Sequence, residues 1–208
     1  MSSTWSNNIT FSIFGESHGP AIGVVMDNVP PGESIDMDKL MQFMARRAPK
    51  KDATSTQRRE KDLPQIMSGF LNGKTTGTPL CAFIQNTDQH SQDYMKSKLD
   101  TLVRPGHADY TAYVKYGRIE SGGGQFSGRM TAALCVAGGI CLQLLEQEGI
   151  RIISRIASVG AAEGCGELLS STAQKPFPVV NDACGEAMQQ AILQAKAAGD
   201  SLGGVIQC

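Results

Sequence analysis

The sequence has no excess of charge of either sign. Its 19 Lys and Arg side chains are balanced by 20 Asp and Glu, which leaves a net charge of −1 at pH 7. Bulk nucleic-acid binding usually depends on a basic excess, so this balance argues against it. The charges are unevenly placed, with 15 basic and 13 acidic residues in 1–130 against 4 and 7 in 131–208. We therefore expect a small anionic ligand to bind the first part of the chain.

The six cysteines lack the spacing of a metal site, because no CxxC pair occurs and no histidine stands at ligand spacing from them. We expect neither a bound metal nor a disulfide framework. The N-terminus lacks a basic segment followed by an apolar one, which predicts no signal peptide. The most apolar stretch, 130–145, contains two glycines and is shorter than a bilayer span requires. These absences predict a cytoplasmic protein that binds no membrane.

Length and composition are those of a globular protein, with 208 residues, 41% hydrophobic and 19% charged. Apolar runs at 11–14 and 22–27 predict strands joined by a tight loop. Met37, Leu40, Met41 and Met44 recur at helical spacing behind Asp36, a plausible N-cap. Further patterns predict a hairpin around 72–79, helices over 105–116, 127–148 and 182–198, and strands over 151–159 and 204–208. The last strand has barely begun at residue 208, so we expect a single domain over 1–208, truncated at its C-terminus.

A glycine run, 122–124, precedes the long apolar helix predicted over 127–148. A dinucleotide fingerprint is weak here because serine occupies position 127, where glycine is required. Two interpretations remain open. Backbone N–H groups at a helix start, with Arg129 nearby, can bind phosphate; alternatively, the run is a turn that packs closely against a neighbouring segment.

Two of the three histidines lie among small residues that leave room for a ligand. His18 lies within Gly-Glu-Ser-His-Gly, and His107 within Arg-Pro-Gly-His-Ala-Asp. Histidine suits acid–base chemistry near neutral pH. Arginines in the same basic half of the chain suit carboxylates and phosphates. Together these residues indicate a site for a multiply anionic substrate; the arginines concerned are Arg47, Arg104 and Arg129.

These segments, in this order, resemble the chorismate synthase family. The matching pieces are FGESHG (14–19), RRAP (46–49), QRRE (57–60), NTD (86–88), RPGHADY (104–110) and SGRMT (127–131). The likeness runs from about residue 8 to about residue 160. The two histidine-containing motifs together are highly specific.

The resemblance implies an α+β fold, with helices packed between antiparallel sheets, and a homotetramer at full length. It also implies a lyase of the shikimate pathway, which leads to aromatic amino acids. The family converts 5-enolpyruvylshikimate 3-phosphate to chorismate by loss of phosphate and a ring proton. The reaction requires reduced FMN, with NADPH as a possible reductant.

The family's functional residues map onto positions named above. The resemblance implies that His18 protonates the leaving phosphate and that His107 protonates the reduced flavin. It implies a substrate pocket lined by Ser17, Arg47, Arg104 and Arg129. The first flavin-contacting segment would be Gln125, Phe126 and Ser127.

The sequence departs from the family in three ways. Many members carry arginine where this chain has Ala53, and Arg-Ser-Ser-Ala where it has residues 125–128. Family members also continue well past this length, so we expect the chain alone to be inactive. The competing hypothesis is a nucleotide- or flavin-binding module without this activity.

Overall fold

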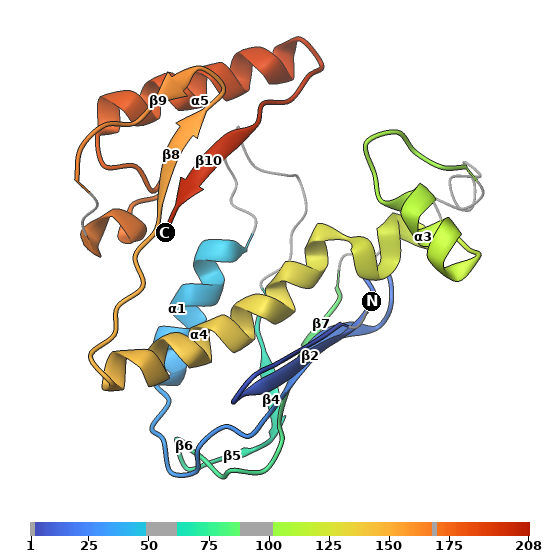
Figure 1. Ribbon diagram of the computed structural model, residues 1–208, viewed down its shortest axis with the longest axis vertical. Coiled ribbons are helices and arrows are strands. Elements are labelled where there is room, and N and C mark those ends of the chain that lie inside the picture. The colour runs from blue at the N-terminus through green and yellow to red at the C-terminus, as the bar shows by residue number, and fades with distance from the viewer. Residues whose placement is uncertain (1–2, 49–61, 88–101, 168–169) are drawn as a thin grey trace. The chain divides into compact units, whose positions relative to one another are not determined.

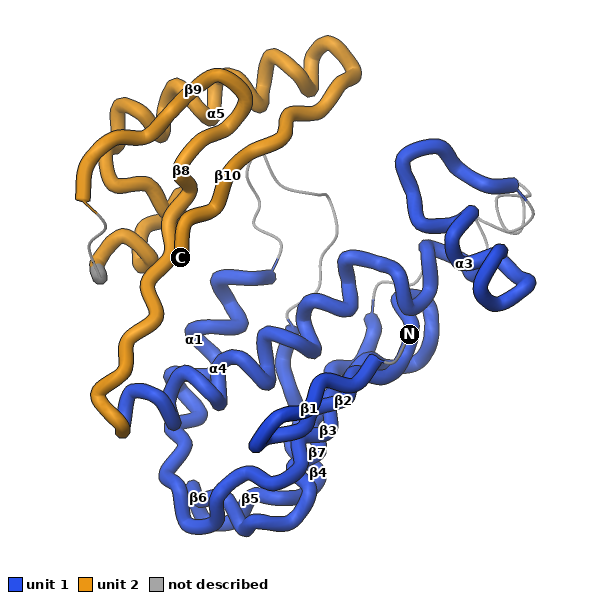
Figure 2. The backbone as a smooth tube through the Cα atoms, in the orientation of Figure 1, with its two compact units in different colours: residues 1–49, 58–147 blue, residues 50–57, 148–208 orange. Residues whose placement is uncertain are grey.

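The computed structural model describes residues 3–48, 62–87, 102–167 and 170–208 (Figure 1). Two compact units divide the chain, the first made of residues 1–49 and 58–147 and the second of residues 50–57 and 148–208 (Figure 2). The single domain over 1–208 stays a prediction.

The first unit is built on an antiparallel five-stranded sheet of order β1-β2-β3-β7-β4. Its strands are β1 (Thr4–Ser6), β2 (Thr10–Gly15), β3 (Ala21–Asp27), β7 (Leu80–Gln85) and β4 (Gln65–Ser68). Alternate residues of β3 and β7 are buried, as expected where one face of a sheet covers a core. The two strands predicted over 11–14 and 22–27 are confirmed as β2 and β3, and a short β5–β6 hairpin (Phe70–Leu71, Lys74–Thr75) lies beyond β4.

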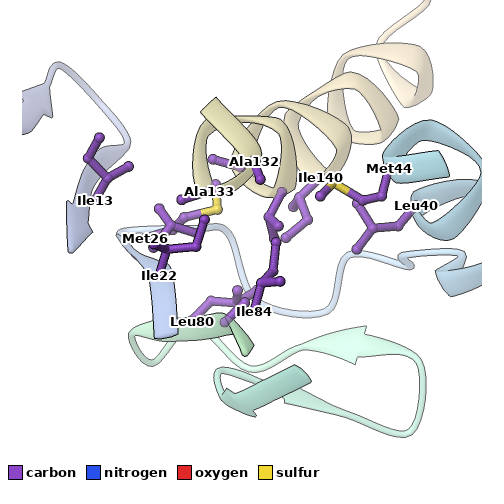
Figure 3. Packing of buried hydrophobic residues seen from close by; sticks show 14 of the residues in the cluster. Ile13, Ile22, Met26, Leu40, Met44, Leu80, Ile84, Ala132, Ala133 and Ile140 are labelled. Carbon is purple, nitrogen blue, oxygen red and sulfur yellow. The ribbon is translucent and has the colours of Figure 1, made fainter. Parts of the chain in front are cut away.

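Helix α1 (Met37–Arg47) begins where its sequence predicts. The Asp36 carboxylate accepts hydrogen bonds from the N–H groups of Asp38 and Lys39, at 2.9 and 3.1 Å, and so caps the helix. Leu40 and Met44 are buried. They join side chains of the sheet and of helix α4 (Thr131–Gln147) in a single hydrophobic core (Figure 3).

Helix α4, with the 3-10 turn η2 (Gly128–Met130) before it, is long and apolar enough by composition to cross a membrane. The expectation that this stretch is too short is therefore wrong. Half of its most apolar 18-residue window is buried inside the protein. The helix contacts β2, β3 and β7 of the sheet, so packing in the core accounts for its apolar composition.

Helices α1 and α4 approach each other closely at Gly139. A Cβ added there would lie 2.6 Å from Leu40 Cδ1 and 3.0 Å from Phe43 Cδ1. One turn further on, the Gln143 amide accepts from the Asp36 N–H at 2.8 Å and donates to its carbonyl at 3.0 Å. The start of α1 is thereby fixed against α4.

The predicted helix over 105–116 is shorter in the structure. Helix α3 (Asp109–Tyr116) begins four residues later, because residues 105–108 form a turn in which the His107 N–H donates to the Arg104 carbonyl at 3.3 Å. The glycine run lies in η1 (Ser121–Phe126), where Gly122, Gly123 and Gly124 all have positive φ.

The second unit has a three-stranded antiparallel sheet of order β10-β8-β9. Its strands are β8 (Arg155–Val159), β9 (Ala162–Glu163) and β10 (Gly204–Gln207). A short turn, η3 (Ser170–Gln174), precedes α5 (Asp182–Ala197), which contacts β8 and β9. Both units therefore combine helices with antiparallel sheets, which confirms the α+β class.

Two adjacent glycines of α4 allow a matched test of this packing. We expect Gly138→Ala to raise the free energy of unfolding by about 0.5–1 kcal/mol, because nothing lies within 4 Å of the added Cβ and alanine favours helix. The free energy of unfolding of Gly139→Ala should be lower than that of Gly138→Ala by at least about 1 kcal/mol, because the added Cβ at 139 would clash with Leu40 and Phe43 of α1. Urea unfolding of both variants measures the difference; equal stabilities would contradict the close contact.

Candidate functional site

The loop between β2 and β3, residues 16–20, is fixed by hydrogen bonds from Asn86. The Asn86 amide nitrogen donates to the carbonyls of Glu16 and Gly19, at 2.9 and 2.8 Å. Its backbone N–H donates to the Pro20 carbonyl at 3.1 Å. Because Asn86 is buried, these three bonds fix the loop that carries Ser17 and His18.

Ser17 and His18 meet the glycine run at the top of this loop. The Ser17 hydroxyl lies 2.9 Å from His18 Nδ1 and donates to the Gly122 carbonyl at 3.2 Å. The Ser17 N–H donates to the Gly124 carbonyl at 3.2 Å. Since the hydroxyl proton points to Gly122, the oxygen is placed to accept from Nδ1–H, which leaves Nε2 as the nitrogen that Ser17 does not engage.

The glycine run is required by close packing against His18. Gly122 has φ +64, and a Cβ there would lie 2.1 Å from His18 Cε1. The run is also separated from α4 by Ser127 and η2, so it does not form the start of that helix. The structure therefore confirms that the run packs closely against a neighbouring segment, while phosphate binding at the helix start beside Arg129 stays a prediction.

Two of the predicted substrate arginines converge on one buried carboxylate, Asp62. Arg47 Nη1 donates to Asp62 Oδ2 at 2.5 Å, and Arg129 Nη1 donates to Asp62 Oδ1. The Arg129 and Asp62 side chains are 1% and 0% exposed, whereas Arg47 is 21% exposed. Arg47 Nη2 also reaches the Gly128 carbonyl at 3.3 Å and the Thr131 hydroxyl at 3.4 Å.

This group is connected to the histidine loop through Arg129. Its Nε donates to Asn86 Oδ1 at 3.1 Å, and Asn86 holds the carbonyls of the loop. Arg47, Asp62, Asn86 and Arg129, which we call the Asp62 cluster, carry a net charge of +1. A continuous path of hydrogen bonds therefore joins a part-exposed guanidinium on α1 to the backbone carbonyls that flank Ser17 and His18.

Arg104 and His107 lie in a separate group at the start of α3. The Arg104 guanidinium forms a bidentate pair with Asp109, at 2.7 and 3.0 Å, and its N–H donates to the same carboxylate at 3.1 Å. These bonds hold the pKa of Asp109 below its usual range, and the charge of His107 adds to the effect. His107 is exposed, and its Nδ1 lies 3.1 Å from the Pro105 carbonyl.

A cavity of about 120 Å³ lies beside the loop, under α3 and η1. Its wall includes two carboxyl groups, Glu16 and Glu120, with Arg118 bonded to Glu120 at 2.7 Å. Loss of solvent raises the pKa of Glu16, the neighbouring Glu120 raises it further, and Arg118 acts in the opposite direction. We call this space the carboxyl cavity.

The three predicted flavin-contacting residues do not share one binding surface. Gln125 and Phe126 line the carboxyl cavity, with the Phe126 ring 6.0 Å from that of Tyr116. Ser127 instead accepts from the Arg129 N–H at 3.3 Å and caps η2. Ligand pockets usually enclose about 300–1,000 Å³, so a cavity of about 120 Å³ with two carboxyl groups does not fit an anionic flavin mononucleotide.

Sequence reasoning missed Asp62 and Glu120 as site residues and gave Asn86 no role beyond its place in a matching motif. Asp62 ends the polar segment 50–62, which resembles an ordinary solvated loop. The sequence feature that could have indicated Asp62 is the position of an acidic residue at the end of a segment rich in basic residues. Ala53 and the matching segment 57–60 lie outside the described residues.

The fold and the site define an α+β protein in which a serine–histidine loop packs on a glycine-rich segment and is supported by two arginines that share one buried aspartate. The family model for chorismate synthase matches residues 9–208, and the chain belongs to this family. Chorismate synthases from Parabacteroides distasonis and Thermococcus kodakarensis are 41% and 40% identical to it, over 99% and 96% of this chain but only 58% and 56% of their own length. The chain thus spans little more than half of these relatives.

A solved structure described as a crystal structure of chorismate synthase has the same fold. It superposes with a TM-score of 0.72 over 96% of this chain and 57% of its own, at 24% identity. At 24% identity this structural similarity supports the fold alone. The assignment to the family rests on the family model and the sequence relatives.

Removal of the Asp62 charge should destabilise the first unit. In Asp62→Asn the guanidinium of Arg129 stays buried without its counter-charge, which costs about 3–5 kcal/mol. The matched control is Asp182→Asn, whose side chain is 80% exposed and paired with Lys175; it should change stability by less than about 1 kcal/mol. Chemical denaturation measures both, and similar losses in the two variants would contradict the role of burial.

The carboxyl cavity gives a prediction with a defined sign. We expect Glu16 to titrate above 4.5, its ordinary value, in carboxyl-carbon NMR. Glu120→Gln should lower the pKa of Glu16 and Arg118→Gln should raise it, because one removes a negative and the other a positive neighbour.

The raised pKa also sets a direction for stability. The contribution of the protonated Glu16 is fully present below pH 4.5 and is lost as the pH rises through the folded-state pKa. Shifts of the same sign in both variants would show that the two groups do not face Glu16 as described.

Proposed function

We propose that this chain supplies the substrate-binding and proton-donating part of a lyase that converts 5-enolpyruvylshikimate 3-phosphate to chorismate. The observation that carries the proposal is the chain of contacts from Arg47 through Asp62 and Arg129 to Asn86, which holds the Glu16 and Gly19 carbonyls on either side of Ser17 and His18. These contacts link a cationic cluster to the loop that carries an acid–base residue. Membership of the chorismate synthase family supports the same activity.

The chemistry needs both parts of this support. The bond to the phosphate oxygen and a ring C–H bond break, and the ring double bond that lies between the two sites shifts, so that the product gains one carbon–carbon double bond. Protonation by a neighbouring acid and fixed positive charge both stabilise the phosphate as it leaves. His18, oriented through Nδ1 by Ser17, would protonate it, while the part-exposed Arg47 would hold an anionic group. Arg129, which is 1% exposed, would contact the substrate only after Asp62 is displaced.

Arg104 and His107 belong to the proposal as a second group. In the family-based assignment Arg104 contacts substrate and His107 protonates reduced FMN. Their exposed turn at the start of α3 leaves His107 accessible. Gln125, Phe126 and Ser127 stay the proposed first flavin-contacting segment, although the carboxyl cavity itself is too small to enclose the flavin.

The oligomeric state, the cofactor and the location of the enzyme are also proposals that rest on the family resemblance. We infer a homotetramer at full length, with reduced FMN as cofactor, NADPH as possible reductant, and a cytoplasmic location. Light scattering on a completed chain tests the tetramer directly.

The decisive experiment uses a completed chain. The 208 residues are joined to the part of the Parabacteroides distasonis relative that this chain does not match, and phosphate release from 5-enolpyruvylshikimate 3-phosphate is followed anaerobically with reduced FMN. Chorismate is detected separately as product. Phosphate release without chorismate, or no reaction at all in a folded chimera, would refute the proposed function.

Within that chimera, His18→Asn should lower kcat by about 10²- to 10⁴-fold, the usual range for loss of a general acid. The matched control is His90→Asn, which alters a histidine without an assigned role and should keep full activity. An unchanged kcat in His18→Asn would remove His18 from the chemistry.

The 208-residue chain alone should be catalytically silent. The cavity beside its predicted flavin-contacting residues does not fit the flavin, and catalytic groups tolerate displacements of only about 0.5 Å. In the same anaerobic assay we expect no turnover and weak or absent FMN binding. Turnover of about 1 s⁻¹ or more, at the low end for ordinary enzymes, would show that the chain is an enzyme by itself.

A further inference from the structure

Two cysteines of the second unit lie in contact, although all six cysteines are free thiols. The sulfur atoms of Cys165 and Cys184 are 3.9 Å apart, and the residues are 19 positions apart in the sequence. Cys165 follows β9, and Cys184 lies in the first turn of α5. The pair therefore connects a strand end with a helix start.

The backbone around Cys165 is anchored on both sides. The Gly164 N–H donates to the Ala157 carbonyl at 2.8 Å, and the Gly166 carbonyl accepts from Arg155 Nη1 at 2.8 Å. Gly166 has φ +110, and a Cβ there would lie 2.8 Å from Val180 Cγ1. This conformation favours glycine, so the sequence holds Cys165 in one narrow turn.

Cys184 is positioned independently by the cap of α5. Its N–H donates to Asn181 Oδ1 at 3.3 Å, beside the Ala183 N–H at 2.9 Å. The following residue, Gly185, is buried against Val179, where a Cβ would approach Cγ2 to 2.6 Å. The two sulfurs are thus brought together by separately fixed backbones.

The remaining cysteines are less suited to thiol chemistry or lie apart from this contact. Burial raises the pKa of the Cys135 and Cys141 thiols, which disfavours the reactive thiolate. Cys165, in contrast, is exposed, and Cys184 is half-buried. A soluble disulfide reagent can therefore reach Cys165, and Cys184 lies within reach of the mixed disulfide that forms there.

We propose that Cys165 and Cys184 form a thiol–disulfide exchange site for small disulfides such as oxidised glutathione. The thiolate of Cys165 attacks one sulfur of glutathione disulfide, which breaks that bond and releases one glutathione. The Cys184 thiolate then attacks Cys165 Sγ in the mixed disulfide and releases the second. Two protein thiols are oxidised, one glutathione disulfide is reduced to two glutathiones, and the two protons pass to them.

The intramolecular bond would join the end of β9 to the start of α5. Closing a loop of this size restricts the unfolded chain and stabilises the folded one. The second unit would then resist unfolding more strongly in oxidising than in reducing conditions. This inference does not depend on the proposed enzymatic function.

Peptide mapping tests the bond directly. The 208-residue protein is equilibrated with glutathione disulfide, blocked with iodoacetamide and cleaved after glutamate. Cuts after Glu163, Glu167 and Glu186 place the two cysteines in different peptides, 164–167 and 168–186. We expect these two peptides to appear joined, and to separate on reduction.

Serine variants identify the partners. Cys184→Ser should yield a glutathione adduct on Cys165 in place of the joined peptides, whereas Cys208→Ser, which alters another exposed cysteine, should leave the bond unchanged. Glutathione adducts alone in the unmodified protein, absence of reaction, or pairing of either cysteine with Cys208 would overturn the proposal.

Thermal unfolding provides a second measurement. Oxidised protein should unfold about 5 °C or more above reduced protein, a shift that follows from closure of the loop. The shift should vanish in Cys165→Ser and persist in Cys208→Ser. An equal shift in all three proteins would assign it to a different effect of the oxidant and contradict the site.

Discussion

The Asp62 carboxylate, buried between two guanidinium groups, is the interaction on which the candidate site depends. It neutralises Arg129 inside the protein, where an unpaired charge would be costly. Arg129 can then hold Asn86, and Asn86 holds the carbonyls of the histidine loop. Because Arg47 pairs with the same carboxylate from α1, three distant parts of the first unit share one electrostatic anchor.

Close packing against η1 also helps to position Ser17 and His18. The glycine at position 122 lets His18 lie against the backbone of η1, and Ser17 bonds to the same segment. The same loop contributes Glu16 to the carboxyl cavity. Loss of solvent and the neighbouring Glu120 raise the pKa of Glu16 there, whereas Arg118 lowers it.

The sequence predicts the local parts of this molecule well and the distant contacts poorly. The cap and apolar spacing of α1 depend on neighbouring residues, so Asp36 and its helix were identifiable. Contact between His18 and Ser17 follows from adjacency in the same way. Asp62 and Arg129 are 67 positions apart, and their pairing arises only when the segment before β4 meets η2 in the folded chain. Such a contact leaves no periodic signal, because a buried acid and a solvated acid look alike in a sequence.

The ion pairs also change the charge available to a substrate. The arginines at 47, 104 and 129 stand as three free cations in the sequence. In the structure the Asp62 cluster carries a net charge of +1, and the pair of Arg104 with Asp109 is neutral. The proposed substrate, with two carboxylates and a phosphate, carries more negative charge than this. We therefore expect its binding to replace Asp62 beside the part-exposed Arg47 with an anionic group of the substrate, or to draw on further cations.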